Sequence, residues 1–133
     1  MLVRRLADAP LEEWHQLRTK ILMDAGELGS RNMSVTWIEV PSGVDQELHS
    51  HEEAEQVYVV TAGSGTMKVA GDTQSVSPGD LVMVPPATDH SIANDGDADL
   101  CCISVQSPPI TVSEVYGSAV TTGAAAEYDE EDY

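Results

Sequence analysis

The chain of 133 residues is long enough for one domain with a buried core and too short for two ordinary domains. Its 23 acidic residues outnumber 6 basic residues, and the net charge of −17 argues against nucleic acid or an anionic membrane as a partner. The sequence shows no signal-peptide pattern and no apolar run of membrane-spanning length, so we expect a cytoplasmic protein.

The N-terminal segment 1–32 is expected to be a helical extension. Between residues 10 and 25 apolar side chains recur at helical spacing, Pro10 occupies the first turn and Gly26 marks the end. This pattern predicts one amphipathic helix. His15 lies off the apolar stripe, so we expect it to be a solvated surface residue.

Residues 33–112 change to short β-branched runs separated by turn signals. The runs occupy 33–40, 55–62, 66–70, 73–77, 81–84, 90–94 and 98–106. Many short strands at regular spacing are typical of a sandwich, jelly roll or barrel. Cys101 and Cys102 are neighbours on the last run and should point to opposite faces, which favours packing residues in a reducing compartment over an oxidation-sensitive pair.

The C-terminal segment 113–133 ends in "GAAAEYDEEDY". This stretch is rich in acidic residues and has no apolar periodicity. We therefore expect a mobile or loosely docked acidic tail.

The stretch "ELHSHEEAEQVY" carries the clearest chemical signal. Alternate side chains on a β-strand share a face, so His49 and His51 can hold one ion from a single stretch of backbone. Glu55 has the same parity and follows a short polar turn that can bring its carboxylate beside the imidazoles. His90 follows a double-proline turn at the start of another expected strand. Three imidazoles and one carboxylate suit a first-row transition metal.

The simpler interpretation is that each histidine is a hydrogen-bonded structural residue. The chain has only four histidines, however, and three of them fall in these two contexts. The arrangement therefore favours a metal site over three unrelated structural residues.

At these residues the sequence resembles the cupin superfamily. Its first motif, G(X)5HXH(X)3–4E(X)6G, is matched with one extra residue before the last glycine by Gly43, His49, His51, Glu55 and Gly63. Its second motif, G(X)5PXG(X)2H(X)3N, is matched by Gly79, Pro85, His90 and Asn94. Ala87 stands where the family has glycine, and alanine costs on the order of 1 kcal/mol if that turn needs a positive φ. The resemblance covers residues 34–107.

The resemblance implies an all-β double-stranded β-helix, a jelly-roll barrel, that holds one divalent transition-metal ion (Mn, Fe, Ni or Zn). The ligands that it implies are His49, His51, Glu55 and His90. The nearby carboxylates of Glu52, Glu53 and Asp89 are expected in solvated turns. Four protein ligands on a metal that prefers six leave two positions open for a substrate, which is a catalytic layout.

The pocket wall gives limited information about the substrate. By parity with Glu55, the side chains expected to face the site are those of Val57, Val59 and Thr61, with Ile92 and Asn94 following His90. An apolar face that closes the barrel is expected from Met33, Val35 and Trp37. A mostly apolar lining without arginine fits a small oxygenated metabolite and disfavours sugar phosphates.

Two functions of different classes follow from this site. We favour a metal-dependent enzyme of oxygenase, decarboxylase, isomerase or lyase type, and the alternative is a binding or sensing module without turnover. Turnover needs an acid or base near the open positions. The candidates near the motifs are weak, and they are Asp89, Glu47, Tyr58 and the two cysteines.

A homodimer is also expected. Tyr58 and Val60, on the face opposite Glu55, would add apolar surface that a single barrel cannot enclose, and an amphipathic helix needs a partner. Exposed strand edges need cover as well.

Acidic residues are spread along the whole chain and lysine is scarce, which indicates a halophilic source rather than an ordinary cytoplasm. At about 1 M salt the Debye length falls to roughly 3 Å, so most of the repulsion between these charges disappears. We therefore expect the melting temperature to rise steeply from low salt to molar KCl. Thermal melts of the metal-loaded and chelated protein test this, and a melting temperature independent of salt in both forms would contradict it.

Overall fold

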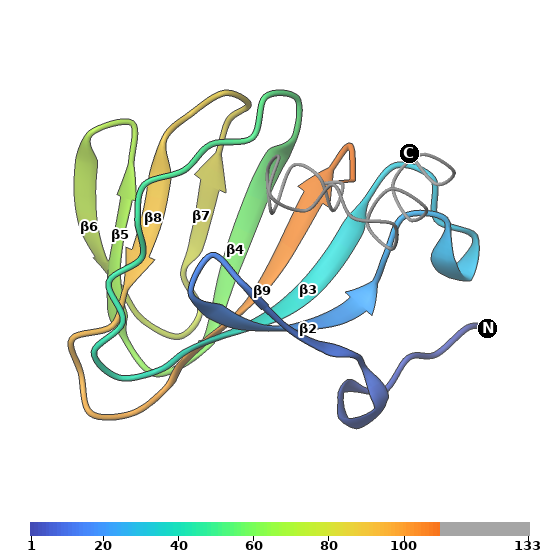
Figure 1. The fold of residues 1–133 in the computed structure, drawn as a ribbon, viewed down its shortest axis with the longest axis horizontal. Coiled ribbons are helices and arrows are strands. Elements are labelled where there is room, and N and C mark those ends of the chain that lie inside the picture. The colour runs from blue at the N-terminus through green and yellow to red at the C-terminus, as the bar shows by residue number, and fades with distance from the viewer. Residues whose placement is uncertain (110–133) are drawn as a thin grey trace.

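The computed structural model of the protein describes residues 1–109 (Figure 1). The expected acidic tail at 113–133 therefore lies outside the described residues, as do residues 110–112 of the expected barrel. Within residues 1–109, no helix has the length and apolar character needed to cross a membrane.

Strands dominate the described part of the chain. Only two short 3-10 helices occur there, η1 (Leu6–Asp8) and η2 (Glu27–Gly29). The strands are β1 (Leu11–Trp14), β2 (Leu17–Met23), β3 (Ser34–Val40), β4 (Glu55–Ala62), β5 (Gly65–Val69), β6 (Asp72–Val76), β7 (Leu81–Val84), β8 (His90–Ala93) and β9 (Leu100–Ser107). The strands expected from the sequence beyond residue 33 are confirmed to within two residues at each end.

The strands form two sheets that face each other (Figure 1). One sheet has six strands in the order β1-β2-β3-β9-β4-β7, and the other has three in the order β6-β5-β8. Each neighbouring pair is antiparallel, and strands distant in sequence, such as β3 and β9, lie side by side. This arrangement confirms the expected all-β jelly-roll barrel.

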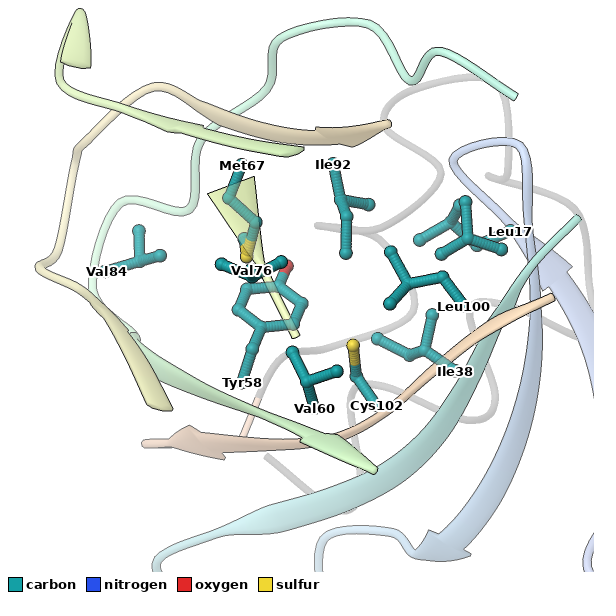
Figure 2. Close-up of a cluster of buried hydrophobic side chains, with 11 residues drawn as sticks. Leu17, Ile38, Tyr58, Val60, Met67, Val76, Val84, Ile92, Leu100 and Cys102 are labelled. Atoms are coloured by element: carbon teal, nitrogen blue, oxygen red, sulfur yellow. The ribbon is translucent and has the colours of Figure 1, made fainter. Parts of the chain in front are cut away.

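The hydrophobic core fills the space between the two sheets. Figure 2 shows Met67 and Ile92 from the smaller sheet pointing toward Tyr58, Val60 and Cys102 from the larger one. Alternation along β9 buries every second side chain, so Cys102 is fully buried whereas Cys101 is half-buried on the other face. Both cysteines are free thiols, as expected for packing residues.

The helix expected at residues 10–25 is wrong. These residues form the hairpin of β1 and β2, in which Trp14 pairs with Leu17 across a two-residue turn of His15 and Gln16. Strand β2 then pairs with β3, so the hairpin extends the six-stranded sheet. Residues 1–32 are thus a mainly β-structured extension rather than a helical one.

Burial along the hairpin explains why the strand prevails over the helix. Leu11 begins the apparent helical stripe but is 53% exposed, whereas Leu17 and Thr19 are each 3% exposed. Burial at alternate positions is the period of a strand, and β-branched Thr19 and Ile21 favour it. The apolar residues at helical spacing are therefore not the residues that the hairpin buries.

The expected facing of β3 and β4 is also wrong. On β3 the inward side chains are Ser34, Thr36, Ile38 and Val40, whereas Met33 just before the strand is exposed and Val35 and Trp37 are half-buried on the outer face. On β4 the buried side chains are Gln56, Tyr58 and Val60, whereas Glu55 and Thr61 are exposed and Val57 and Val59 are half-buried. The bend at residues 52–53 interrupts the alternation of inward and outward side chains that begins at His49. On β4 the even-numbered residues therefore face inward, whereas the odd-numbered His49 and His51 do so before the bend.

This facing removes the surface on which the dimer expectation depended. Tyr58 and Val60 are 2% and 1% exposed and belong to the core. The amphipathic helix that was expected to need a partner is a hairpin within the sheet. The homodimer stays a prediction that now depends only on the unpaired sheet edges.

Candidate metal centre

Three histidines from two distant segments converge inside the barrel. The possible ligand nitrogens of His49, His51 and His90 all lie within 4.8 Å of one another. The ring centroids are 4.2 Å apart for His49 and His90, 5.3 Å for His49 and His51, and 5.5 Å for His51 and His90. Three nitrogens about 2.1 Å from one ion lie roughly 3 Å from one another, so modest rotation of these rings suffices to bind a single metal.

Backbone hydrogen bonds hold the three histidines in register. His49 and His90 form an antiparallel bridge, with N–O distances of 3.1 Å from His49 to His90 and 2.9 Å in the reverse direction. The carbonyl of His51 accepts a bond of 2.7 Å from the amide of Ala87. Ala87 has φ of 56°, so the residue that replaces the family glycine does adopt the strained conformation considered from the sequence.

In two of the imidazoles, a hydrogen bond at Nδ1 orients the ring and leaves Nε2 free to bind a metal. Nδ1 of His49 lies 3.2 Å from the carbonyl oxygen of Glu47, and Nδ1 of His90 lies 2.9 Å from that of Thr88. A carbonyl only accepts, so each Nδ1 carries the proton and each Nε2 keeps a free lone pair. Such a bond to the non-ligating nitrogen is the usual outer support of a metal-bound histidine.

Several buried polar atoms near the histidines have no hydrogen-bond partner. They are Nε2 of His90, Nδ1 of His51, Nε2 of His15 and Oε1 of Gln56. Each buried, unsatisfied group costs about 1–3 kcal/mol. A metal and its ligands would satisfy such a cluster, so the residues present fit a bound ion.

Burial keeps the histidines neutral. It lowers the pKa of His51 to about 3 and that of His90 to about 4, and mutual repulsion among the imidazoles adds to the effect for His51. Burial also lowers the pKa of His49, against the opposing effect of its bond to the Glu47 carbonyl. Neutral imidazole is the form that binds a metal, so the site is ready for one near pH 7.

Glu55 is not brought into this group. Its side chain is exposed at the start of β4, and the cluster of possible ligands within residues 1–109 contains the three histidines without it. Its neighbour Gln56 is buried on the inner face of β4 and lines the same cavity as His49 and His51. The structure therefore places an amide, not a carboxylate, on the side where the fourth ligand was expected.

A buried network fixes the orientation of the Gln56 amide. Nε2 of Gln56 donates to Oγ of Ser104 over 2.8 Å, and Nε2 of Gln106 donates to the same oxygen over 2.7 Å. Oγ of Ser34 in turn donates to Oε1 of Gln106 over 2.7 Å. Because this network binds the nitrogen of Gln56, its oxygen is the atom left without a partner.

His15, expected on the solvated surface, lies against the site instead. Its ring stacks on His49, with centroids 4.4 Å apart and planes 14° from parallel. It lies 6.2 Å from the ring of His51 and is not part of the three-histidine group. Burial, and then the neighbouring His49, lowers the pKa of His15 to about 4. No turn-favouring residue marks the hairpin in the sequence, which is why His15 was missed.

A cavity of about 50 Å³ adjoins His49 and His51 on the inner face of the six-stranded sheet, where it is lined by residues of β2, β3, β4 and β9. Its apolar wall comes mainly from Leu17, Ile21, Met23 and Ile38. Its polar wall comes from the neutral side chains of Thr19, Ser34, Thr36, Gln46, Gln56 and Gln106, and Asp24 also lines the cavity. Lysine and arginine are absent from the lining, so the cavity suits a small molecule without a phosphate group.

Two of the acid or base candidates near the motifs, Tyr58 and Cys102, are poorly suited to act as bases near pH 7. Burial raises the pKa of Tyr58 above its ordinary value and that of Cys102 to about 12. Asp89, Glu52 and Glu53 are exposed, which agrees with the solvated turns expected for them, and Glu47 is exposed as well. Tyr58 can therefore donate a hydrogen bond within the barrel but does not serve as a base.

The comparison with known families is decisive at this point. The family model of the cupin domain matches residues 36–106, which include all three histidines. The chain belongs to the cupin family. The expectation drawn from the two motifs is thus confirmed.

Two curated proteins and one solved structure illustrate what this cupin is similar to. An uncharacterized protein of Methanocaldococcus jannaschii is 34% identical over 70 residues, and an oxalate-binding protein of Thermotoga maritima is 29% identical over 68. These matches cover 53% and 51% of this chain, and the chain spans about half the length of both relatives (56% of each). The solved structure of a predicted oxalate decarboxylase from Thermotoga maritima has a TM-score of 0.73 at 21% identity, over 80% of this chain and 99% of that one.

Proposed function

We propose that this cupin is an enzyme that binds one divalent transition-metal ion and acts on a small oxygenated metabolite at that ion. The observation that carries the proposal is the convergence of His49, His51 and His90, with the Nε2 atoms of His49 and His90 left free by bonds at Nδ1. A divalent ion held there supplies Lewis acidity and open positions for substrate oxygens. Manganese, iron, nickel and zinc all accept such a ligand set.

The fourth protein ligand in this proposal is Oε1 of Gln56 rather than the carboxylate of Glu55. The cupin motif allows three or four residues between the second histidine and the acidic position. A count of four places Gln56 there and leaves six residues before Gly63, as the motif requires. Ser104 holds the amide so that its oxygen remains available.

A neutral fourth ligand changes which molecules the site favours. Three imidazoles and an amide leave the charge of a divalent ion uncompensated, whereas a carboxylate would remove one unit of it. The uncompensated charge of the ion therefore attracts a small anionic oxygen ligand, such as a carboxylate, although the lining has no arginine or lysine and includes Asp24. The oxalate-binding relative supports a ligand of this class.

The second candidate function is binding or sensing without turnover. It is favoured by the state of Tyr58 and Cys102, whose raised pKa values exclude them as bases near pH 7. Under the enzyme proposal, the acid–base group is a substrate group or a water molecule. Consumption of small hydroxy, keto and dicarboxylic acids by the metal-loaded protein distinguishes the two functions.

Matched variants at positions 55 and 56 test the ligand set. Replacing Gln56 by alanine is expected to weaken Zn²⁺ and Mn²⁺ binding about 10-fold, because it removes an oxygen ligand, as measured by isothermal titration calorimetry. Gln56→Glu is expected to strengthen binding, because it adds a negative charge. Glu55→Ala serves as the control and should leave the metal affinity unchanged. Weaker binding in Glu55→Ala with normal binding in Gln56→Ala would restore Glu55 as the ligand.

A further inference from the structure

The β1–β2 turn is attached directly to the segment that carries the metal ligands. The backbone carbonyl of His15 accepts a bond of 2.8 Å from Nε2 of Gln46. The side-chain oxygen of Gln16 accepts one of 2.9 Å from the amide of Glu47. These contacts join the tip of the hairpin to the two residues that precede the ligand stretch, so the position of the turn is fixed relative to His49.

The backbone of this turn is strained. His15 and Gln16 have φ of 48° and 72°, which is the left-handed region that favours glycine and asparagine in two-residue hairpin turns. A residue with a β-carbon held there costs about 1–3 kcal/mol, and such residues cluster at functional sites. If this turn had only a structural role, asparagine and glycine at positions 15 and 16 would form it with less strain. The presence of histidine and glutamine there therefore points to a role for their side chains.

The side chain of His15 has a free hydrogen-bonding atom in the cavity. Its Nε2 is buried and has no partner, and the residue lines the same cavity as His49, His51 and Gln56. It also lines an outer pocket of about 500 Å³ with Gln16, Glu47, Leu48 and His49. His15 and His49 therefore lie between the interior cavity and the outer pocket, and His15 lies beside the three-histidine group without belonging to it.

We propose that His15 is a substrate-contacting residue of this cupin, and that its Nε2 hydrogen-bonds an oxygen of the bound molecule that is not held by the metal. The ligand class is a small carboxylate with a second oxygen, because the cavity of about 50 Å³ has room for only a few heavy atoms. The β1–β2 turn is then the element that determines specificity. This inference rests on the proposed function.

The test uses the full chain loaded with Co²⁺, whose visible absorption reports ligand binding, and two probes, glycolate and acetate. Glycolate has a second oxygen and acetate has none. His15→Asn suits the turn, because asparagine tolerates a positive φ while its shorter side chain does not reach the position of Nε2. We expect His15→Asn to bind Co²⁺ normally, to lose about 5- to 10-fold in glycolate affinity, and to bind acetate as the wild type does.

Two further variants separate a contact from a general disturbance of the turn. The glutamine side chain of His15→Gln also carries a hydrogen-bonding amide but is longer than asparagine. His15→Gln should therefore bind glycolate more tightly than His15→Asn does. Glu12→Gln lies on the exposed part of the same hairpin and should match the wild type with both probes.

The contrary results are distinct from one another. Equal glycolate affinity in His15→Asn and wild type would overturn the inference and leave the metal centre intact. A loss of 10-fold or more in Co²⁺ affinity would make His15 a metal ligand, which also overturns it. A wild-type protein that does not bind Co²⁺ would instead overturn the proposed function on which the inference rests.

Discussion

Replacing His51 by alanine is expected to lower the affinity for a divalent transition-metal ion by at least about 100-fold, which corresponds to about 2.7 kcal/mol. His51 is 6% exposed and supplies one of three nitrogens in the cluster, so the remaining ligands would hold the ion through fewer bonds. Competition with a chelating indicator at pH 7.5 measures the effect.

The control for this change is Glu53→Ala, an exposed residue two positions along the chain. It removes a negative charge near the site without removing a ligand. Its metal affinity should stay within about 2-fold of the wild type, because exposed charges are screened by salt. Equal metal binding by His51→Ala and wild type would show that the ion, if any, binds elsewhere.

The metal-free protein is expected to lose stability as the pH falls from about 6.5 to 5. The pKa of His51 is lowered to about 3 and that of His90 to about 4, whereas in the unfolded chain both are near 6.5. Within this window the unfolded state binds more protons than the folded state, so acid favours unfolding. The two histidines together contribute a loss of about 3 kcal/mol between pH 6.5 and 5.

Urea denaturation in the presence of a chelator measures this loss. The window ends at pH 5, because carboxylates begin to titrate below it and relieve the repulsion within this acidic chain. His51→Ala removes one of the titrating groups and should show a shallower decline. A free energy of unfolding that is constant from pH 7.5 to 5 would mean that the histidines are solvated and do not form a buried cluster.

The barrel was predictable because turn residues separate its strands so regularly. From Ser34 to Ser107, each β-branched run is bounded by glycine, proline or aspartate, and each became a strand. The hairpin at Leu11–Met23 was not predictable in this way. Its turn consists of His15 and Gln16, and neither residue type favours a turn. The exposed Leu11 also completes an apolar pattern at helical spacing, which favoured a helix.

The clustering of the three histidines was predictable from their spacing, but the inward-facing residue of β4 was not predictable from strand parity. Parity holds only along a continuous strand, and the bend after His51 interrupts it, so Gln56 rather than Glu55 faces inward. The distance to Gly63 favours the Gln56 ligand proposed above, because six residues separate position 56 from Gly63. The preference of metal sites for a carboxylate favoured Glu55 instead.

The position of His15 beside the site depends on tertiary structure that local sequence does not encode. Its stacking on His49 follows from the pairing of β2 with β3 and from the bonds that Gln46 and Glu47 make to the turn. No periodicity within the segment reports these contacts. Residues brought to a site by a separate hairpin are therefore found only when the sheet order is known.

The most direct measurement of the central claim is a crystal structure of the Mn²⁺- or Zn²⁺-loaded protein, with the ion located by anomalous scattering. We expect one ion inside the barrel, bound by nitrogens of His49, His51 and His90 and by Oε1 of Gln56, at about 2.0–2.3 Å. The imidazole of His15 should lie beside the open positions without binding the ion. An empty barrel after metal loading, or an ion held by the carboxylate of Glu55 with Gln56 turned away, would contradict it.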